Sequence, residues 1–352
     1  MAEKKIHNTK KAILNAMFVI ALLAFTFYYV FKGEDIEEIS MYVRSADKFY
    51  LLMALGMVLI FVCSESVIIH YLMHNLNYKL PLKNCIRYSF IGFFISYITP
   101  SASGGQPAQM YFMKKDHVPL SASTLVLIIV TIAYKFVLLF IGFITLFFSF
   151  SFIMENIASV WGILLLGVIL NIIVIGFLLL VIFKQSLAKR VIGMILIWLG
   201  RIGLVKNYKK RLVHFLQGMK KYEMGAAYMK THKHLFFHVF LITLIQRIAL
   251  FMVTYFVYRS FGLQGISAYK IVLLQTLIAI AVDNLPLPGG MGVTEGLYCV
   301  FFQKIFGSAL VIPSLILSRG ISFYAVLLIG GIITLWSYFM KPHPQTYDEF
   351  EE

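Results

Sequence analysis

Charged side chains are scarce in this chain. Asp, Glu, Lys and Arg together make up 13% of its 352 residues, whereas hydrophobic residues make up 60%. A soluble domain typically carries roughly 25% charged residues, so this composition excludes an ordinary soluble protein. The mean hydropathy of +0.84 agrees with that exclusion. We therefore expect an all-helical protein that crosses a membrane several times.

Cysteine pairs and nucleotide-binding motifs are missing as well. The three cysteines, Cys63, Cys85 and Cys299, stand far apart and form no CxxC pair, so a disulfide framework is not predicted. The sequence contains no GxxxxGKS or GxxxxGKT phosphate loop, and GGMGVTEG (289–296) does not match GxGxxG. We expect no nucleotide and no other cofactor.

Two histidine pairs have the spacing of metal ligands on one helix face, His70 with His74 and His234 with His238. Both pairs fall at the ends of predicted helices and lack a third ligand, whereas a zinc site takes at least three protein ligands. We interpret them as histidines at the membrane interface and predict no metal site.

Acidic residues are outnumbered, and the formal net charge is +15. The basic residues gather in particular loops, above all in segment 184–233, where Glu223 is the single acid. Such clustering is typical of the cytoplasmic loops of membrane proteins. Stretches 191–205 and 209–230 favour helices that lie at the interface against anionic lipid headgroups. A nucleic-acid surface is the alternative interpretation, and this distribution of charge disfavours it.

Long apolar runs predict six full membrane crossings within one integral membrane domain, residues 1–352. Each run is long enough to span ~30 Å of hydrocarbon at ~1.5 Å per residue. The first run is too long for the apolar core of a cleaved signal peptide. The basic flanks put both termini in the cytoplasm. The predicted crossings are 12–31, 49–73, 120–150, 157–183, 235–258 and 309–339.

Two further apolar segments are interrupted, at TPSASGGQP (99–107) and at LPLPGGMGV (285–293). An arm of about 12 residues reaches only about 18 Å, which is mid-bilayer. We predict two re-entrant helical hairpins that enter from opposite sides. Residues 49–150 and 235–339 then form inverted repeats, in which Pro100 corresponds to Pro286 and Gly104-Gly105 to Gly289-Gly290. Interrupted segments at matching places in inverted halves indicate the midplane site of a transporter.

The composition of the breaks predicts an anion site. Glycine permits backbone with positive φ, and Pro107 suits the first turn of a returning helix. Each returning helix would point its N-terminus, with free N–H groups and partial positive charge, towards mid-bilayer. A lipid phosphate would fit there. Irregular backbone at this depth also requires surrounding protein or a water-filled cavity.

Six ionisable residues lie where hydrocarbon would disfavour them: Glu65, Lys135, Arg247, Asp283, Glu295 and Arg319. They form either a polar site or structural ion pairs. Glu295 has a further interpretation as an acid that stabilises a helix N-terminus. Gln106 and Gln109 either donate to a headgroup or satisfy the backbone at the break. The predicted site is Glu65, Gly104, Gly105, Gln106, Gln109, Arg247, Asp283, Asn284, Gly289, Gly290, Thr294, Glu295 and Arg319.

The motifs TPSASGGQPAQMYFMKK (99–115), PLPGGMGVTEG (286–296) and SRGISFY (318–324) resemble those of the lysylphosphatidylglycerol synthase transmembrane-region family. The resemblance covers nearly the whole chain. It implies the flippase half of the bacterial multiple peptide resistance factor, which moves aminoacylated phosphatidylglycerol to the outer leaflet. Many relatives carry an acidic or arginine-containing motif at TIAYKFVLLF (131–140), so no role for Lys135 is carried over. The short tail after residue 339 leaves no room for the synthase domain, and we expect a stand-alone member.

The leading hypothesis is a lipid flippase or scramblase of the bacterial plasma membrane. Its partners would be phospholipids, either anionic or aminoacylated phosphatidylglycerol such as lysylphosphatidylglycerol. One alternative is an integral membrane enzyme that modifies lipids with the same acids and bases. Another is a membrane partner of a separate phosphatidylglycerol lysyltransferase, docked through segment 184–233. The identity of the lipid, the direction, the energy source and the oligomeric state stay open.

Overall fold

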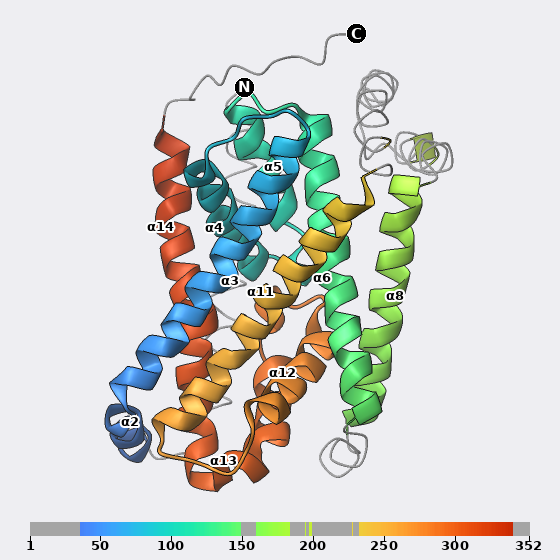
Figure 1. The fold of residues 1–352 in the computed structure, drawn as a ribbon. Helices are drawn as coiled ribbons and strands as arrows, with labels where there is room; N and C mark the ends of the chain where they lie inside the picture. The colour runs from blue at the N-terminus through green and yellow to red at the C-terminus, as the bar shows by residue number, and fades with distance from the viewer. Residues whose placement is uncertain are drawn as a thin grey trace.

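The computed structural model of the chain describes residues 36–148, 160–183 and 232–340, with four isolated positions between 194 and 227. Every regular element in these ranges is helical (Figure 1). The α-helices are α2 (Ile36–Ser45), α3 (Lys48–Asn75), α4 (Leu82–Ile98), α5 (Gly105–Lys115), α6 (Leu120–Phe148), α8 (Trp161–Phe183), α11 (Lys233–Ser260), α12 (Ala268–Val282), α13 (Val293–Arg319) and α14 (Ala325–Phe339).

Five helical stretches in the described residues are long and apolar enough to cross a membrane. They are α3, α6, α8, α11 and the stretch Pro288–Phe339, and they match five of the six predicted crossings. The predicted crossing 12–31 lies outside the described residues, as does almost all of segment 184–233. Outward side chains such as Phe143 and Ile172 are exposed apolar groups, which is the surface that a lipid environment requires. The protein is an all-helical polytopic membrane protein.

Helices α3 and α11 pack side by side along the bundle (Figure 1). Small and branched residues fill their contact, with Ala54, Val58 and Val62 of α3 against Val253 of α11, all almost fully buried. Close packing of such side chains holds helices together in lipid, where the hydrophobic effect between helices is weak. Both hairpins pack against this pair of helices, the first against α3 and the second against α11.

The two helical hairpins come from opposite ends of the bundle and their breaks meet in its middle (Figure 1). The first hairpin is α4 and α5, and the second is α12 and the first part of α13. In the first, the arms touch so closely that a Cβ on Gly105 would lie 2.6 Å from the carbonyl oxygen of Gly92. Glycine is therefore required there by the approach of two backbones.

The two breaks share one backbone conformation, in a register that differs from the predicted one. Each has a short 3₁₀ turn, Pro100–Ala102 in the first and Pro288–Gly290 in the second. Ser101 has φ 51° and ψ 28°, and Gly289 has φ 56° and ψ 14°. Pro100 thus corresponds to Pro288, and the predicted match with Pro286 is wrong by two residues. Sequence alignment favoured the Gly-Gly pairs, whereas the turn geometry follows the prolines.

The expectation that glycines supply positive φ is right for the second break and wrong for the first. Gly289, Gly290 and Gly292 all have positive φ. In the first break Gly104 has φ −86°, and the left-handed residues are Ser101 and Ala102, each with φ 51°. Left-handed backbone in non-glycine residues costs roughly 1 kcal/mol or more each. The surrounding contacts must hold this turn in place.

The last crossing begins where Gly307, with φ 75° and ψ 169°, separates it from the returning arm of the second hairpin. Near its middle the helix makes a π-helical turn over Gly320–Tyr324. One extra residue in a turn shifts the helix face, and Ser318, Arg319, Ser322 and Phe323 all face the same internal space. Such bulges often occur at functional sites.

Candidate functional site

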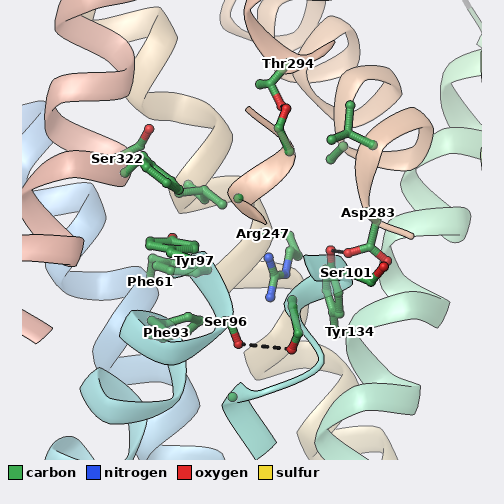
Figure 2. Close-up of a pocket in the computed structure, with 18 of the residues that line it drawn as sticks. Phe61, Phe93, Ser96, Tyr97, Ser101, Tyr134, Arg247, Asp283, Thr294 and Ser322 are labelled. Atoms are coloured by element: carbon green, nitrogen blue, oxygen red, sulfur yellow. Dashed lines mark hydrogen bonds between the residues drawn. The ribbon is translucent and has the colours of Figure 1, made fainter. Parts of the chain in front are cut away.

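A cavity of about 470 Å³ lies where the two breaks meet. Its wall is formed by α3, α4, α5, α6, α11, α12, α13, both breaks and the π-helical turn that follows Arg319. Figure 2 shows Arg247 near its centre, with Phe61 and Tyr97 on one side and Tyr134 and Asp283 on the other. Ten predicted site residues line it: Glu65, Gly105, Gln106, Gln109, Arg247, Asp283, Gly289, Gly290, Thr294 and Arg319. Gly104, Asn284 and Glu295 do not.

Arg247 is the cation of this cavity that forms no salt bridge within the described ranges. Arg247 is 8% exposed. Its guanidinium carbon lies 3.8 Å from the ring centroid of Tyr134 and 5.2 Å from that of Phe61. Within the described ranges it forms no ion pair, and its Nε has no hydrogen-bond partner. Aromatic faces stabilise a guanidinium without neutralising it. Glu65 interacts with this charge electrostatically but forms no salt bridge with it, so the guanidinium has no direct ion-pair partner in the cavity.

Glu65 of α3 is held by a glutamine of α5. Glu65 Oε1 accepts a hydrogen bond of 2.8 Å from Gln109 Nε2, and Glu65 is 7% exposed. Gly92 makes this contact possible, because a Cβ there would lie 2.3 Å from Gln109 Nε2. Gln109 thus supports a carboxylate rather than the backbone of the break. Gly92 was not predicted, since an isolated glycine in an apolar helix gives no such signal.

The first break is fastened to its surroundings by side chains of the neighbouring helix and of the second break. Gln106 Nε2 donates to Thr131 Oγ1 on α6. Ser101 Oγ donates to the carbonyl oxygen of Leu285 at 3.1 Å, which links one break directly to the other. These contacts explain how Ser101 is kept in its left-handed conformation. The two breaks form one structural unit.

Lys135 and Asp283 form a buried ion pair, with 2.5 Å between Nζ and Oδ2. Tyr134 donates its hydroxyl to the other oxygen of Asp283, and Lys135 also donates to Asn284 Oδ1 at 2.8 Å. Asn284 acts here through Lys135 and not from the cavity wall. The structure therefore gives Lys135 a structural contact with the second break, a role that the sequence left open.

Glu295 pairs with Arg319, and it also caps its own helix. Its Oε1 accepts from Arg319 Nε at 2.8 Å, and its Oε2 accepts from the Gly292 amide at 2.7 Å. Arg319 additionally donates to the carbonyl oxygen of Gly289 at 3.3 Å. The two interpretations of Glu295, as an ion-pair partner and as a helix cap, both hold. Of the six predicted ionisable residues, four are thus in ion pairs, and Glu65 and Arg247 are not.

The glycines and the threonine of the breaks contribute shape. A Cβ on Gly289 would lie 2.4 Å from the Phe323 ring, and one on Gly104 would lie 2.7 Å from Thr99. Thr294 turns its hydroxyl to the carbonyl oxygen of Gly290 at 2.9 Å. Substitution at these glycines would therefore push the break out of its packing.

Several cavity residues were missed by sequence reasoning. Aromatic side chains of apolar helices, Phe61, Tyr97, Tyr134 and Phe323, gave no signal because such residues are also common in ordinary spans. A second missed group is polar and uncharged, with Gln275 Nε2 donating to Thr254 Oγ1 at 2.7 Å and Tyr298 donating to Ser314 at 3.1 Å. The sequence signal that could have identified these positions is a single polar residue within an otherwise apolar helix.

Histidines of both predicted pairs contact neighbouring segments. His70 Nδ1 lies 2.7 Å from the carbonyl oxygen of Leu80, and His238 Nδ1 lies 3.0 Å from the Tyr71 hydroxyl. Within the described ranges, no group of three His, Cys, Asp or Glu side chains is arranged to hold a metal ion. These contacts tie helix ends together.

Fold and cavity define a class of protein: a polytopic helical membrane protein in which two broken hairpins enclose a cavity lined by apolar, polar and charged side chains. The sequence profile of the lysylphosphatidylglycerol synthase TM region matches residues 13–330. The chain belongs to this family. It is also similar to a UPF0104 membrane protein of Pyrococcus horikoshii, with 26% identity over 310 residues, covering 85% of this chain and 90% of the relative.

Proposed function

We propose that this protein moves phospholipid headgroups across the membrane through the cavity between the two breaks, as a flippase or scramblase. Desolvation of a charged headgroup is the barrier to lipid movement, and a cavity inside the protein that offers charged and polar side chains lowers it. Family membership supports a role in lipid handling. The observation that carries the proposal is Arg247, a buried cation that faces this cavity and forms no salt bridge with the described residues.

The phosphate of the headgroup would bind at Arg247. A guanidinium offers two parallel N–H donors to a phosphate, and it keeps its charge at every physiological pH. Arg247 already rests on Tyr134 and Phe61, so little reorganisation is needed when an anion arrives. A buried guanidinium without a salt bridge carries a desolvation cost of several kcal/mol. An entering phosphate would offset that cost.

An amine on the headgroup would approach Glu65. This carboxylate lines the cavity, and Gln109 occupies one of its oxygens. A headgroup with both phosphate and amine matches this pair of groups, as aminoacylated phosphatidylglycerol does. The proposed setting is the bacterial plasma membrane, with both hairpins re-entrant and both termini in the cytoplasm. An ion gradient would drive the movement, or the lipid would exchange passively between the leaflets.

The test is a liposome assay of labelled phospholipid movement with purified full-length protein. Wild type is compared with Arg247→Ala and with Arg259→Ala, a matched change on the same helix. Arg259 contacts the hydroxyls of Tyr50 and Tyr255 and does not line the cavity. We expect at least a roughly tenfold lower rate for Arg247→Ala, equivalent to about 1.4 kcal/mol, and an unchanged rate for Arg259→Ala.

A second comparison tests the substrate class. Glu65→Gln should slow aminoacylated phosphatidylglycerol more than phosphatidylglycerol, because only the former brings an amine to the carboxylate. Equal rates for wild type and Arg247→Ala would refute the assignment of the site. Appearance of a new lipid species during the assay would instead support a lipid-modifying enzyme.

A further inference from the structure

The ammonium of Lys135 lies in a cage of three oxygen atoms. They are Asp283 Oδ2 at 2.5 Å, Asn284 Oδ1 at 2.8 Å and Asn171 Oδ1 at 3.3 Å. An ammonium has three N–H donors, so the cage satisfies it completely. Lys135 is 7% exposed and Asn171 is fully buried. An ion pair alone would require the carboxylate but neither amide.

The cage is built at the C-terminal end of a broken helix. Helix α12 ends at Val282, and Asp283 follows directly. Such an end carries partial negative charge, which favours a cation. Asn171 is fixed in orientation because its Nδ2 donates to the carbonyl oxygen of Gly167 at 2.9 Å, so its Oδ1 must face Lys135.

The cage also depends on close approach of α8 to α12. A Cβ on Gly167 would lie 2.2 Å from the carbonyl oxygen of Ile280 and 2.8 Å from the Cα of Ala281. Glycine at 167 therefore lets Asn171 reach the end of α12. Three elements, α6, α8 and the second break, meet at one positive charge. Nothing in the proposed passage of a headgroup requires this convergence.

One carboxylate and two amide oxygens at the end of an interrupted helix are ligands that a small cation also uses. We propose that Lys135 is a tethered monovalent cation, whose ammonium occupies a cation site formed by Asp283, Asn284 and Asn171. The side chain replaces a dissolved ion and locks α6 and α8 to the second break. When the lysine side chain is removed, the site takes sodium or a small alkylammonium ion.

The test measures the melting temperature of purified full-length protein in detergent, which does not depend on lipid movement. Lys135→Ala removes three carbons and the nitrogen, the size of propylammonium. Sodium chloride and propylammonium chloride are the probes, each compared with choline chloride at equal ionic strength. We expect the melting temperature of Lys135→Ala to rise by ~3 °C when the cation is present at about ten times its dissociation constant. Wild type should respond equally to all three salts.

Two further variants make the result decisive. Lys135→Met fills the space without a charge, and Lys135→Ala with Asp283→Asn removes the carboxylate, so neither should respond to sodium or propylammonium. If Lys135→Ala does not fold in choline, we expect the probes during extraction to restore a monodisperse protein. The same response in wild type, or none in Lys135→Ala, overturns the proposal. So does failure of Lys135→Ala to fold in every salt while the double variant folds.

Discussion

Arg247 and Tyr134 form a stacked pair at the centre of the cavity, with 3.8 Å between the guanidinium carbon and the ring centroid. They come from α11 and α6, which belong to different predicted repeats. The hydroxyl of the same tyrosine donates to Asp283 at the second break. One ring thus links Arg247, which forms no salt bridge in the described residues, to the buried ion pair. Substitutions at Tyr134 can therefore separate the stacking contact with Arg247 from the hydrogen bond to Asp283.

Tyr134→Phe should keep the ring under Arg247 and lose the hydrogen bond to Asp283. Because a bond to a charged group contributes about 1.5–3 kcal/mol, we expect a lower free energy of unfolding and retained lipid movement. Tyr134→Leu should lose both, since it also removes the cation–π contact. Thermal unfolding and the liposome assay measure the two effects. Equal transport in both variants would show that the stacking is irrelevant to movement of the headgroup.

Gly92→Ala should displace Gln109 from Glu65, because the added methyl would lie 2.3 Å from Gln109 Nε2. Overpacking of this kind typically costs about 1–3 kcal/mol. The matched control is Gly56→Ala on α3, where a Cβ would meet nothing within 4 Å. That control should be neutral or stabilise by roughly 0.5–1 kcal/mol. Melting temperatures of the two variants should therefore move in different directions or by clearly different amounts.

Glu295→Gln should destabilise the second break strongly. It leaves Arg319 without its carboxylate, and breaking a buried pair from one side typically costs about 3–5 kcal/mol. Glu295→Gln combined with Arg319→Gln should recover part of that loss, because no buried charge is left unpaired. A double-mutant cycle on thermal unfolding measures the coupling. Purely additive effects would contradict the pairing.

Ala102→Gly should stabilise the first break, since Ala102 has φ 51° and glycine adopts that conformation without strain. The gain should be up to about 1 kcal/mol. Ser101→Ala keeps the strained φ and loses the bond to Leu285, so it should destabilise by about 1 kcal/mol. Comparing these two variants separates the cost of backbone strain from the contribution of the hydrogen bond between the two breaks. The sign of each change in melting temperature is the outcome to measure.

Water should reach the first break from inside the bundle. Ser103 lines the cavity and is exposed, so Ser103→Cys in a background without Cys63, Cys85 and Cys299 should react with small water-soluble thiol reagents. Phe143→Cys is the control, because Phe143 is 70% exposed on the apolar outer surface of α6 and should face lipid. Protection of Ser103→Cys in membranes would count against a re-entrant hairpin beside a hydrated cavity.

The long spans could be predicted closely from sequence. Helices α3, α6, α8 and α11 begin and end within a few residues of the predicted crossings, because hydrocarbon thickness fixes how many apolar residues a span needs. The interrupted segments were also visible, since glycine, proline and polar residues seldom gather within an apolar run unless the helix breaks there. The inverted repeats stay a prediction, and the shared conformation at Ser101 and Gly289 is a local similarity of the two breaks.

The partners within the site could not be predicted. Six ionisable residues were visible in the sequence, but three-dimensional proximity decides which of them pair. Lys135 meets an aspartate almost 150 positions away along the chain, and Gln109 meets Glu65 on another helix. The local register of the breaks was misjudged for a related reason. Identical glycines suggested one alignment, and the backbone conformation follows the prolines.

By itself, the sequence determined that this protein is a helical membrane protein with two broken segments, because apolar length and backbone breakers act locally on the chain. Only the tertiary structure decided that, among the described residues, Arg247 forms no salt bridge while Lys135 and Arg319 are paired. A buried charge is stabilised or exposed by groups that packing brings to it, and those groups come from distant helices.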